Sequence, residues 1–312
     1  NTFGTSFEND ADIKRLAIEH IEEKHGADSL TSIARCKTEG DEKTVVRQVQ
    51  LCFDTKSSKP DAFVPLFYEA AAALQETITA AGAVPLLHVG GSASALKDDP
   101  SHTAEVLAAA VESGGYEGLF LDLAELSSAQ KKDFTALAEA LRAELGEDRL
   151  LYLMVEAPVW QGAAYNGYDY AALSEPADKL VVRVADYGDV SEDFPIAPLA
   201  PLEEVYYALA ELADQVDSDC LSLLLTTTGS AWTDGRHTGQ ASAAEIEQLL
   251  SASQTKDYYS DRYACAYLET KDTVVWYLNE KALEARQQLL RCFGVSSCCL
   301  STPNGTLQAQ ES

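Results

Sequence analysis

Short apolar runs separated by amphipathic segments fill most of this chain, a pattern that predicts parallel β-strands connected by helices. The run at 118–123 is apolar at almost every position, as in a strand buried on both faces of a parallel sheet. Predicted strands lie at 1–7, 30–36, 45–53, 84–89, 119–123, 150–155, 180–184, 220–225 and 295–300. Predicted helices lie at 10–25, 63–81, 101–112, 129–145, 170–173, 202–216 and 279–292.

This alternation over 312 residues favours a (β/α)8 TIM barrel forming a single domain over 1–312, with a doubly wound open sheet as the alternative. Between residues 226 and 276 the spacing of apolar residues along the sequence changes. A capping box starts at Ser242, a helix runs to Leu250, and two short strands follow at 264–268 and 273–277. We therefore expect a small α+β insertion at 233–277, between strand 7 and the following helix.

Charge and composition exclude several classes of partner. The formal net charge of -27 repels nucleic acid and anionic membrane surfaces. No stretch reaches the roughly 20 apolar residues that would span a bilayer. The chain starts at Asn1 without a leader, so we expect that an export signal or anchor has been removed. The sequence also lacks phosphate-binding loops and the nucleophile elbow, so we expect no cofactor.

The seven cysteines lack the paired spacing of a metal site, so we expect neither a metal nor a disulfide framework. Most lie in apolar runs, where cysteine behaves as a small buried hydrophobe. Adjacent Cys298 and Cys299 would point to opposite faces of their strand.

Acidic residues gather where the predicted strands end, which is where ligands bind in parallel α/β sheets. Asp122 and Glu125 end the run at 118–123, and Ser127 and Gln130 then form a predicted capping box that opens the next helix. Glu156 and Asp186 end two later strands. Clustered carboxylates can raise one another's pKa to supply an acid, or can collect a cation. Trp160 could stack on a sugar ring or pack against the rim.

Several stretches, in order, resemble glycoside hydrolase family 18, and in particular its bacterial branch linked to LysM modules and spore-cortex peptidoglycan. The stretch 88–91 is similar to the third-strand S-x-G-G motif, and 117–125 is similar to the fourth-strand D-G-x-D-x-D-x-E motif. Trp232 follows the seventh strand as in that branch. The resemblance implies a barrel, and a site for N-acetylated sugars in which one Glu protonates the leaving oxygen while an Asp orients the acetamido group.

The departures from this pattern bear directly on activity. Asp122 matches the orienting Asp, but Ala124 stands where the acid should be, and a methyl group cannot donate a proton. The sixth-strand Tyr-Asp pair is replaced by Asp186 and Tyr187 in swapped order. Two aromatic residues of the family's sugar site are also replaced. Thr228 stands where the family has an aromatic residue after the seventh strand, and Cys298 most nearly matches the Trp that forms the floor of the site.

The leading hypothesis is a catalytically degenerate family-18-like barrel that binds an N-acetylated glycan, or has a structural role, at a bacterial cell envelope. Its predicted binding residues are Glu156, Trp160, Asp186, Tyr187 and Trp232. The alternative is an active glycosidase on chitin- or peptidoglycan-type glycans that uses Asp122 with a displaced acid such as Glu125, although strand alternation puts Glu125 on the other face. A third possibility is a protein-interaction module that binds no sugar.

Overall fold

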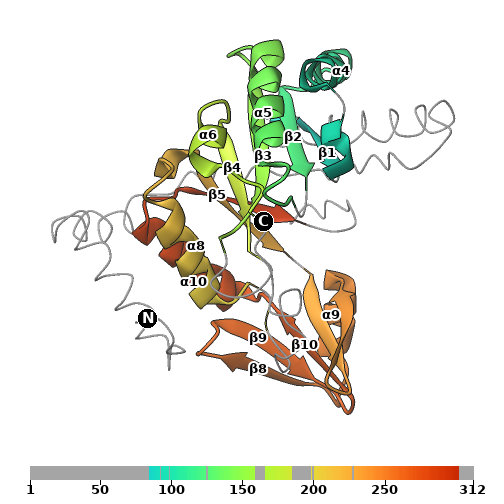
Figure 1. Ribbon diagram of the computed structural model, residues 1–312. Coiled ribbons are helices and arrows are strands. Elements are labelled where there is room, and N and C mark those ends of the chain that lie inside the picture. Colours follow the sequence, from blue (N-terminus) through green and yellow to red (C-terminus); the bar gives the residue numbers. More distant parts are fainter. Residues whose placement is uncertain are drawn as a thin grey trace, which may run out of the picture.

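A parallel sheet forms the centre of the protein (Figure 1). The computed structural model describes residues 84–301 except 92, 98, 124, 125, 159–165, 185–197, 199 and 227, so the elements predicted before residue 84 lie outside the described residues. Within the described ranges all neighbouring strands of this sheet are parallel. In spatial order they are β1 (Leu86–Gly91), β2 (Gly118–Leu123), β3 (Leu150–Glu156), β4 (Lys179–Arg183), β5 (Leu221–Thr226) and β11 (Ser297–Ser301).

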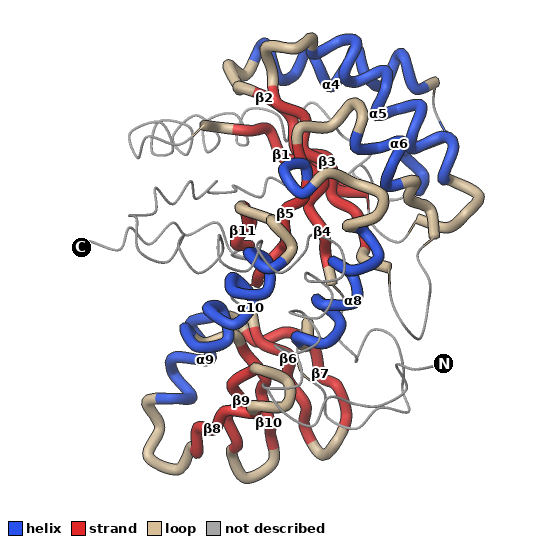
Figure 2. The backbone as a smooth tube through the Cα atoms, turned by 90° about the vertical axis from the view of Figure 1, so that its left-hand side faces the viewer, coloured by secondary structure: helices blue, strands red, loops and turns tan. Residues whose placement is uncertain are grey.

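Helices connect these strands and cover the outer face of the sheet; Figure 2 shows α4, α5 and α6 gathered on one side of the strands. They are α4 (Pro100–Ser113), α5 (Lys131–Leu145), α6 (Tyr170–Ser174), α8 (Leu202–Leu212) and α10 (Glu280–Cys292), with short 3-10 turns at Ala93–Lys97 and Ser218–Cys220. The alternation predicted after residue 84 is therefore confirmed, with ends shifted by a few residues. None of the helices in the described ranges has the length and apolarity needed to cross a bilayer.

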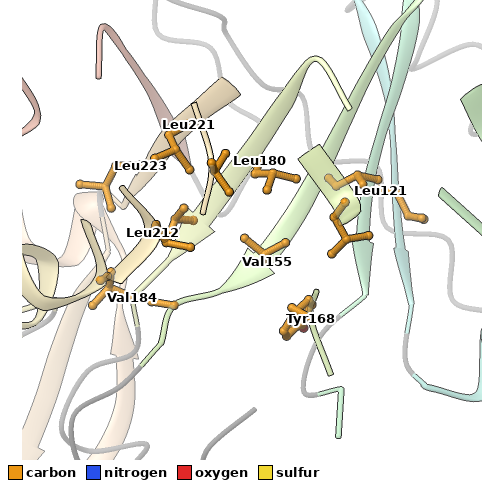
Figure 3. Packing of buried hydrophobic residues seen from close by; sticks show 14 of the residues in the cluster. Leu121, Val155, Tyr168, Leu180, Val184, Leu212, Leu221 and Leu223 are labelled. Atoms are coloured by element: carbon orange, nitrogen blue, oxygen red, sulfur yellow. The ribbon is translucent and has the colours of Figure 1, made fainter. Parts of the chain in front are cut away.

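The strands are buried on both faces because successive side chains point to opposite sides. On the outer side, Leu121, Val155 and Leu180 pack with Leu221 and the helix residue Leu212 (Figure 3). On the inner side, a second cluster contains Phe120, Tyr152, Met154, Val181 and Cys299. The expectation that the run at 118–123 is buried on both faces is thus confirmed, and it explains why nearly every position in it is apolar.

The start of α5 differs from the prediction. The Gln130 side chain accepts hydrogen bonds from the Ser127 backbone N–H and hydroxyl, at 3.0 and 2.6 Å. However, the Ser127 hydroxyl contacts the N–H of Ala129 and not that of Gln130, and the helix begins only at Lys131. These residues form a turn before the helix, so the predicted capping box at Ser127 is wrong. The box predicted at Ser242 is confirmed, with both reciprocal bonds present.

A second, antiparallel sheet follows β5 in the chain. Its strands are β7 (Arg236–Ala241), β6 (Gly229–Thr233), β10 (Thr273–Tyr277), β9 (Cys265–Glu269) and β8 (Lys256–Ser260), in spatial order, and helix α9 (Ala243–Leu250) packs on one face through Ile246. The pattern predicted only β9 and β10 here. β7 and β8 are mostly polar and exposed, so they lack the apolar alternation by which a strand is recognised.

Arg286 of α10 joins the two sheets. Its side chain is fully buried and donates to the carbonyl of Ala200, before α8, at 2.6 Å and to that of Ala264, before β9, at 2.7 Å. Both alanines have positive φ, at 35° and 49°, a conformation that is strained for a residue with a Cβ. The guanidinium therefore holds two strained turns together and links the start of α8 and helix α10 to the second sheet.

Candidate functional site

Four polar side chains lie on the inner face of the parallel sheet, three of them near the carboxyl ends of their strands and one in the middle of β1. They are His88 on β1, Asp122 on β2, Glu156 on β3 and Arg183 on β4. Residues two apart in a strand point to the same face. Asp122 is two residues from Phe120 and Arg183 is two residues from Val181, and both of these apolar residues belong to the inner cluster. The sequence alternation therefore turns all four toward the same interior.

Arg183 bridges the two carboxylates. Its Nε and Nη2 donate to Glu156 Oε1 at 2.9 and 2.5 Å, and the two residues are direct neighbours in the β3–β4 register. Its Nη1 and Nη2 also reach Asp122 Oδ2 and Oδ1, each at 3.3 Å. The guanidinium thus contacts both acids at once, and it holds Glu156 more closely than Asp122.

This arrangement keeps Asp122 ionised. Burial raises the pKa of the Asp122 carboxyl, but His88 and the Arg183 guanidinium lower it by more, so the pKa lies below its ordinary value. For Arg183, burial lowers the pKa, and Glu156 and Asp122 together raise it above its usual range. At neutral pH the cluster therefore holds one cation between two carboxylates.

His88 lies next to Asp122 but makes no hydrogen bond with it. Its Nε2 is 3.9 Å from Asp122 Oδ2, a distance at which charges interact but a hydrogen bond does not form. The ring is only 2% exposed and stacks on Phe120 at 4.8 Å between centroids. In the described part of the chain neither ring nitrogen has a hydrogen-bond partner.

Two tyrosines brace the strand ends beside this cluster. The Tyr168 hydroxyl donates to the carbonyl of Leu123 at 2.8 Å, and the Tyr170 hydroxyl donates to that of Glu156 at 2.8 Å. Tyr168 is 3% exposed and its ring packs edge-on against Phe134 of α5. It is therefore a packing residue of the rim, which holds the chain after β3 against the end of β2.

Of the residues predicted for the site, Asp122 and Glu156 come together through Arg183. Glu125, Trp160, Asp186 and Tyr187 lie outside the described residues, as does Ala124. Trp232 lies on β6 of the second sheet, 5% exposed, and packs with Cys265 and Trp276. Its indole N–H donates to the Ser230 hydroxyl at 3.2 Å.

The correspondence between the family's floor Trp and Cys298 needs correction. Cys299 belongs to the inner cluster, whereas Cys298 packs against the outer one, so Cys299 is the residue of this pair that faces the interior. The prediction that these two cysteines face opposite ways is confirmed. Burial raises the pKa of the Cys299 thiol to about 11. The described ranges contain no group of side chains that could hold a metal ion.

Sequence reasoning missed Arg183, which lies at the end of the strand predicted at 180–184. The available signal was the placement of one arginine among Leu180, Val181 and Val182, because a charge in a buried strand requires an opposite charge nearby. Its partners could not be named, since they lie on strands that are distant in sequence.

The fold is that of an α/β protein with a polar cluster toward the carboxyl ends of its parallel strands, the end at which ligands bind in such folds. Residues 68–292 match the family described as Glycosyl hydrolases family 18, and the chain belongs to that family. It therefore has the predicted (β/α)8 barrel, of which the described residues form the six parallel strands. A sequence search among curated proteins finds no match.

Solved structures of similar fold include a glycosylase, a spore cortex-lytic enzyme and a chitinase. A provisionally assigned sporulation-specific glycosylase of Bacillus subtilis, ydhD, is 20% identical, with a TM-score of 0.63 over 73% of this chain and 84% of the other. The Bacillus cereus spore cortex-lytic enzyme SleL is 14% identical, with a TM-score of 0.64 over 76% and 60%. The family-18 chitinase of Cycas revoluta, in complex with (GlcNAc)3, is 16% identical, with a TM-score of 0.68 over 77% and 82%.

Proposed function

We propose that this family-18 barrel binds an N-acetylated glycan at the carboxyl end of its parallel sheet without hydrolysing it. The observation that carries the proposal is the simultaneous pairing of Arg183 with Asp122 and Glu156. A general acid needs a carboxyl whose pKa is raised toward the working pH. Asp122 has the opposite shift, and Arg183 occupies Glu156 Oε1 with two hydrogen bonds.

The sequence supports the same conclusion. Ala124 stands where the family motif has its proton donor, so the acid is absent from its usual position. Hydrogen-bonding groups and a partly exposed guanidinium remain, and these can recognise sugar hydroxyl and amide groups without bond cleavage. The similar chitinase of Cycas revoluta was solved with (GlcNAc)3, which makes a related oligosaccharide the natural first ligand to test.

We further propose that the protein acts outside the cytoplasm, at a bacterial cell envelope. Its similarity to a spore cortex-lytic enzyme and a sporulation-specific glycosylase supports that location, because such glycans lie in the envelope. The acidic surface suits a soluble, exported module and disfavours binding to nucleic acid.

The test compares binding with hydrolysis for the same purified protein. Binding of chitin-type and peptidoglycan-type oligosaccharides is measured by calorimetry, and long incubations are analysed for reducing ends and by mass spectrometry. We expect binding, no cleavage, and weaker binding in Asp122→Asn. The matched control is Glu247→Gln, which removes an exposed carboxylate from α9, away from the strand ends, and should leave binding unchanged.

Cleavage by the wild-type chain that is lost in Asp122→Asn would overturn the proposal. In that case Glu125→Gln decides whether Glu125 is the displaced acid of an active glycosidase. If no glycan binds, the protein is a structural or protein-interaction module instead. A gain of cleavage in Ala124→Glu would identify the missing acid as the reason for inactivity.

A further inference from the structure

A short segment, residues 166–170, fastens the chain after β3 to the residues that follow β2. The Gly167 N–H donates to the carbonyl of Leu126 at 3.0 Å, and the Tyr168 hydroxyl donates to that of Leu123 at 2.8 Å. Tyr168 is 3% exposed and Leu126 is fully buried. We call residues 166–170 the rim strap, since it closes the rim beside the candidate site.

Packing requires glycine at the second position of the rim strap. A Cβ atom built on Gly167 would lie 2.4 Å from the Cβ of Leu126 and 2.6 Å from its carbonyl carbon, well inside the distance at which carbon atoms attract. Backbone atoms of Leu126 cannot turn aside as the end of a long side chain could. The residue before this glycine, Asn166, is exposed. The rim strap therefore begins with an asparagine in solvent, followed by a glycine that the fold requires and buries.

An asparagine followed by glycine can deamidate without an enzyme, because glycine has no Cβ to hinder attack by its backbone nitrogen. The Gly167 nitrogen forms a bond to Cγ of Asn166, the Cγ–Nδ2 bond breaks, and the side-chain nitrogen leaves as ammonia with the proton of the attacking N–H. Water then opens the cyclic imide at either of its two carbonyl carbons. One product is aspartate. The other is isoaspartate, in which the main chain is longer by one carbon atom.

The closed rim strap opposes the first step of this reaction. The Gly167 nitrogen must lose its proton and approach Cγ of Asn166, but its N–H is bonded to the Leu126 carbonyl and the residue is buried. Reaction therefore requires the strap to open. Local opening costs less free energy than global unfolding, so the folded chain can react, but more slowly than an unconstrained peptide. The hydrogen bond of Tyr168 is one of the contacts that keep the strap closed.

We propose that Asn166 is a site of spontaneous deamidation, that opening of the rim strap sets its rate, and that the isoaspartate product cannot close the strap again. An extra carbon atom in the main chain before Gly167 moves its N–H away from Leu126. It also moves Tyr168 from its place against Phe134, where the ring centroids are 5.8 Å apart. The modification thus loosens the rim of the candidate site as the protein ages. This inference does not depend on the proposed function, because it concerns no ligand.

The experiment incubates the purified chain in mildly alkaline buffer at physiological temperature and follows the peptide that contains Asn166 by mass spectrometry, with chromatography that separates aspartate from isoaspartate. A synthetic peptide of residues 163–170 gives the unconstrained rate. We expect conversion in the folded chain to be slower than in the peptide by about tenfold or more. Tyr168→Phe removes one buried hydrogen bond from the strap and should speed conversion by about fivefold. Asn166→Gln should show no conversion in the same time, because its cyclic imide would need a larger ring.

The matched control is Tyr277→Phe, which removes a tyrosine hydrogen bond to Asp257, 2.7 Å long, from the second sheet. It should leave the rate at Asn166 unchanged. Asn166→Asp carries the new charge on a main chain of normal length and should melt near the wild type, whereas the isolated isoaspartate form should melt lower. Equal rates in the folded chain and the peptide, or equal rates in the wild type and Tyr168→Phe, overturn the proposal. An isoaspartate form that melts with the wild type also overturns it.

Discussion

Replacing Arg183 by methionine should destabilise the protein strongly at neutral pH and much less in acid. The substitution removes the charge and keeps an unbranched apolar side chain of similar reach. It leaves Asp122 and Glu156 facing each other without a cation, with side chains only 13% and 6% exposed. Two like charges in a low-dielectric interior repel, and neither can recover its hydration.

The size of the effect follows from this burial. Breaking a buried ion pair by removing one partner costs about 3–5 kcal/mol. Arg183 is itself 29% exposed, so solvent screens part of the interaction and the lower end of that range applies. For a domain of this size each kcal/mol shifts the melting temperature by roughly 2–4 °C, so a decrease on the order of 10 °C is expected.

The loss of stability in Arg183→Met should depend on pH. In the wild type the pKa of Asp122 is lowered, so its stabilising contribution is present above the unfolded pKa and is lost as pH falls through the folded pKa. Without Arg183, the pKa of Asp122 in the folded variant should rise relative to that in the folded wild type, so the folded variant takes up a proton at a higher pH than the wild type does. Its stability deficit should therefore shrink as pH falls from about 7 to about 4.

Urea unfolding followed by circular dichroism at both pH values measures this deficit. The control is Lys281→Met, which breaks the exposed pair between Lys281 and Asp261, 2.8 Å apart with side chains 56% and 68% exposed. Exposed pairs contribute less than about 1 kcal/mol, so the control should change little at either pH. A deficit for Arg183→Met that is as small as the control's, or that does not change with pH, would refute the reasoning.

Three further predictions concern the frame around the site. Gly118→Ala should lower stability by about 1–3 kcal/mol or more in urea unfolding, because its Cβ would lie 2.1 Å from the backbone oxygen of Leu150. Tyr168→Phe should cost about 1 kcal/mol in the same assay, since it leaves the buried carbonyl of Leu123 without its donor. Cys299, 3% exposed and with a thiol pKa raised to about 11, should be alkylated far more slowly at about pH 8 in the folded chain than in urea, as measured by mass spectrometry of its peptide.

The barrel strands could be predicted because burial on both faces leaves a plain apolar signal. β2 and β3 are apolar at nearly every position, and the α5 stripe contains Phe134, Leu137 and Leu141. β7 and β8 could not, because polar residues such as Arg236 and Lys256 fill strands whose pairing depends on their neighbours. Tertiary hydrogen bonding to β6 and β9 determines those strands, and no local pattern encodes it.

The candidate site was predictable in position but not in chemistry. Asp122 and Glu156 could be placed because acids at strand ends meet at one edge of a parallel sheet. Their pairing could not, because the Arg183 that neutralises them is 61 residues from Asp122 and 27 from Glu156 in the chain.

Arg183 offers a physical reason for the buried carboxylate of Asp122. A buried carboxylate without a partner is costly. The guanidinium pairs with Asp122 and with Glu156, so both acids stabilise the strand ends as halves of ion pairs. The presence of Asp122 therefore has a structural explanation that is independent of any chemistry.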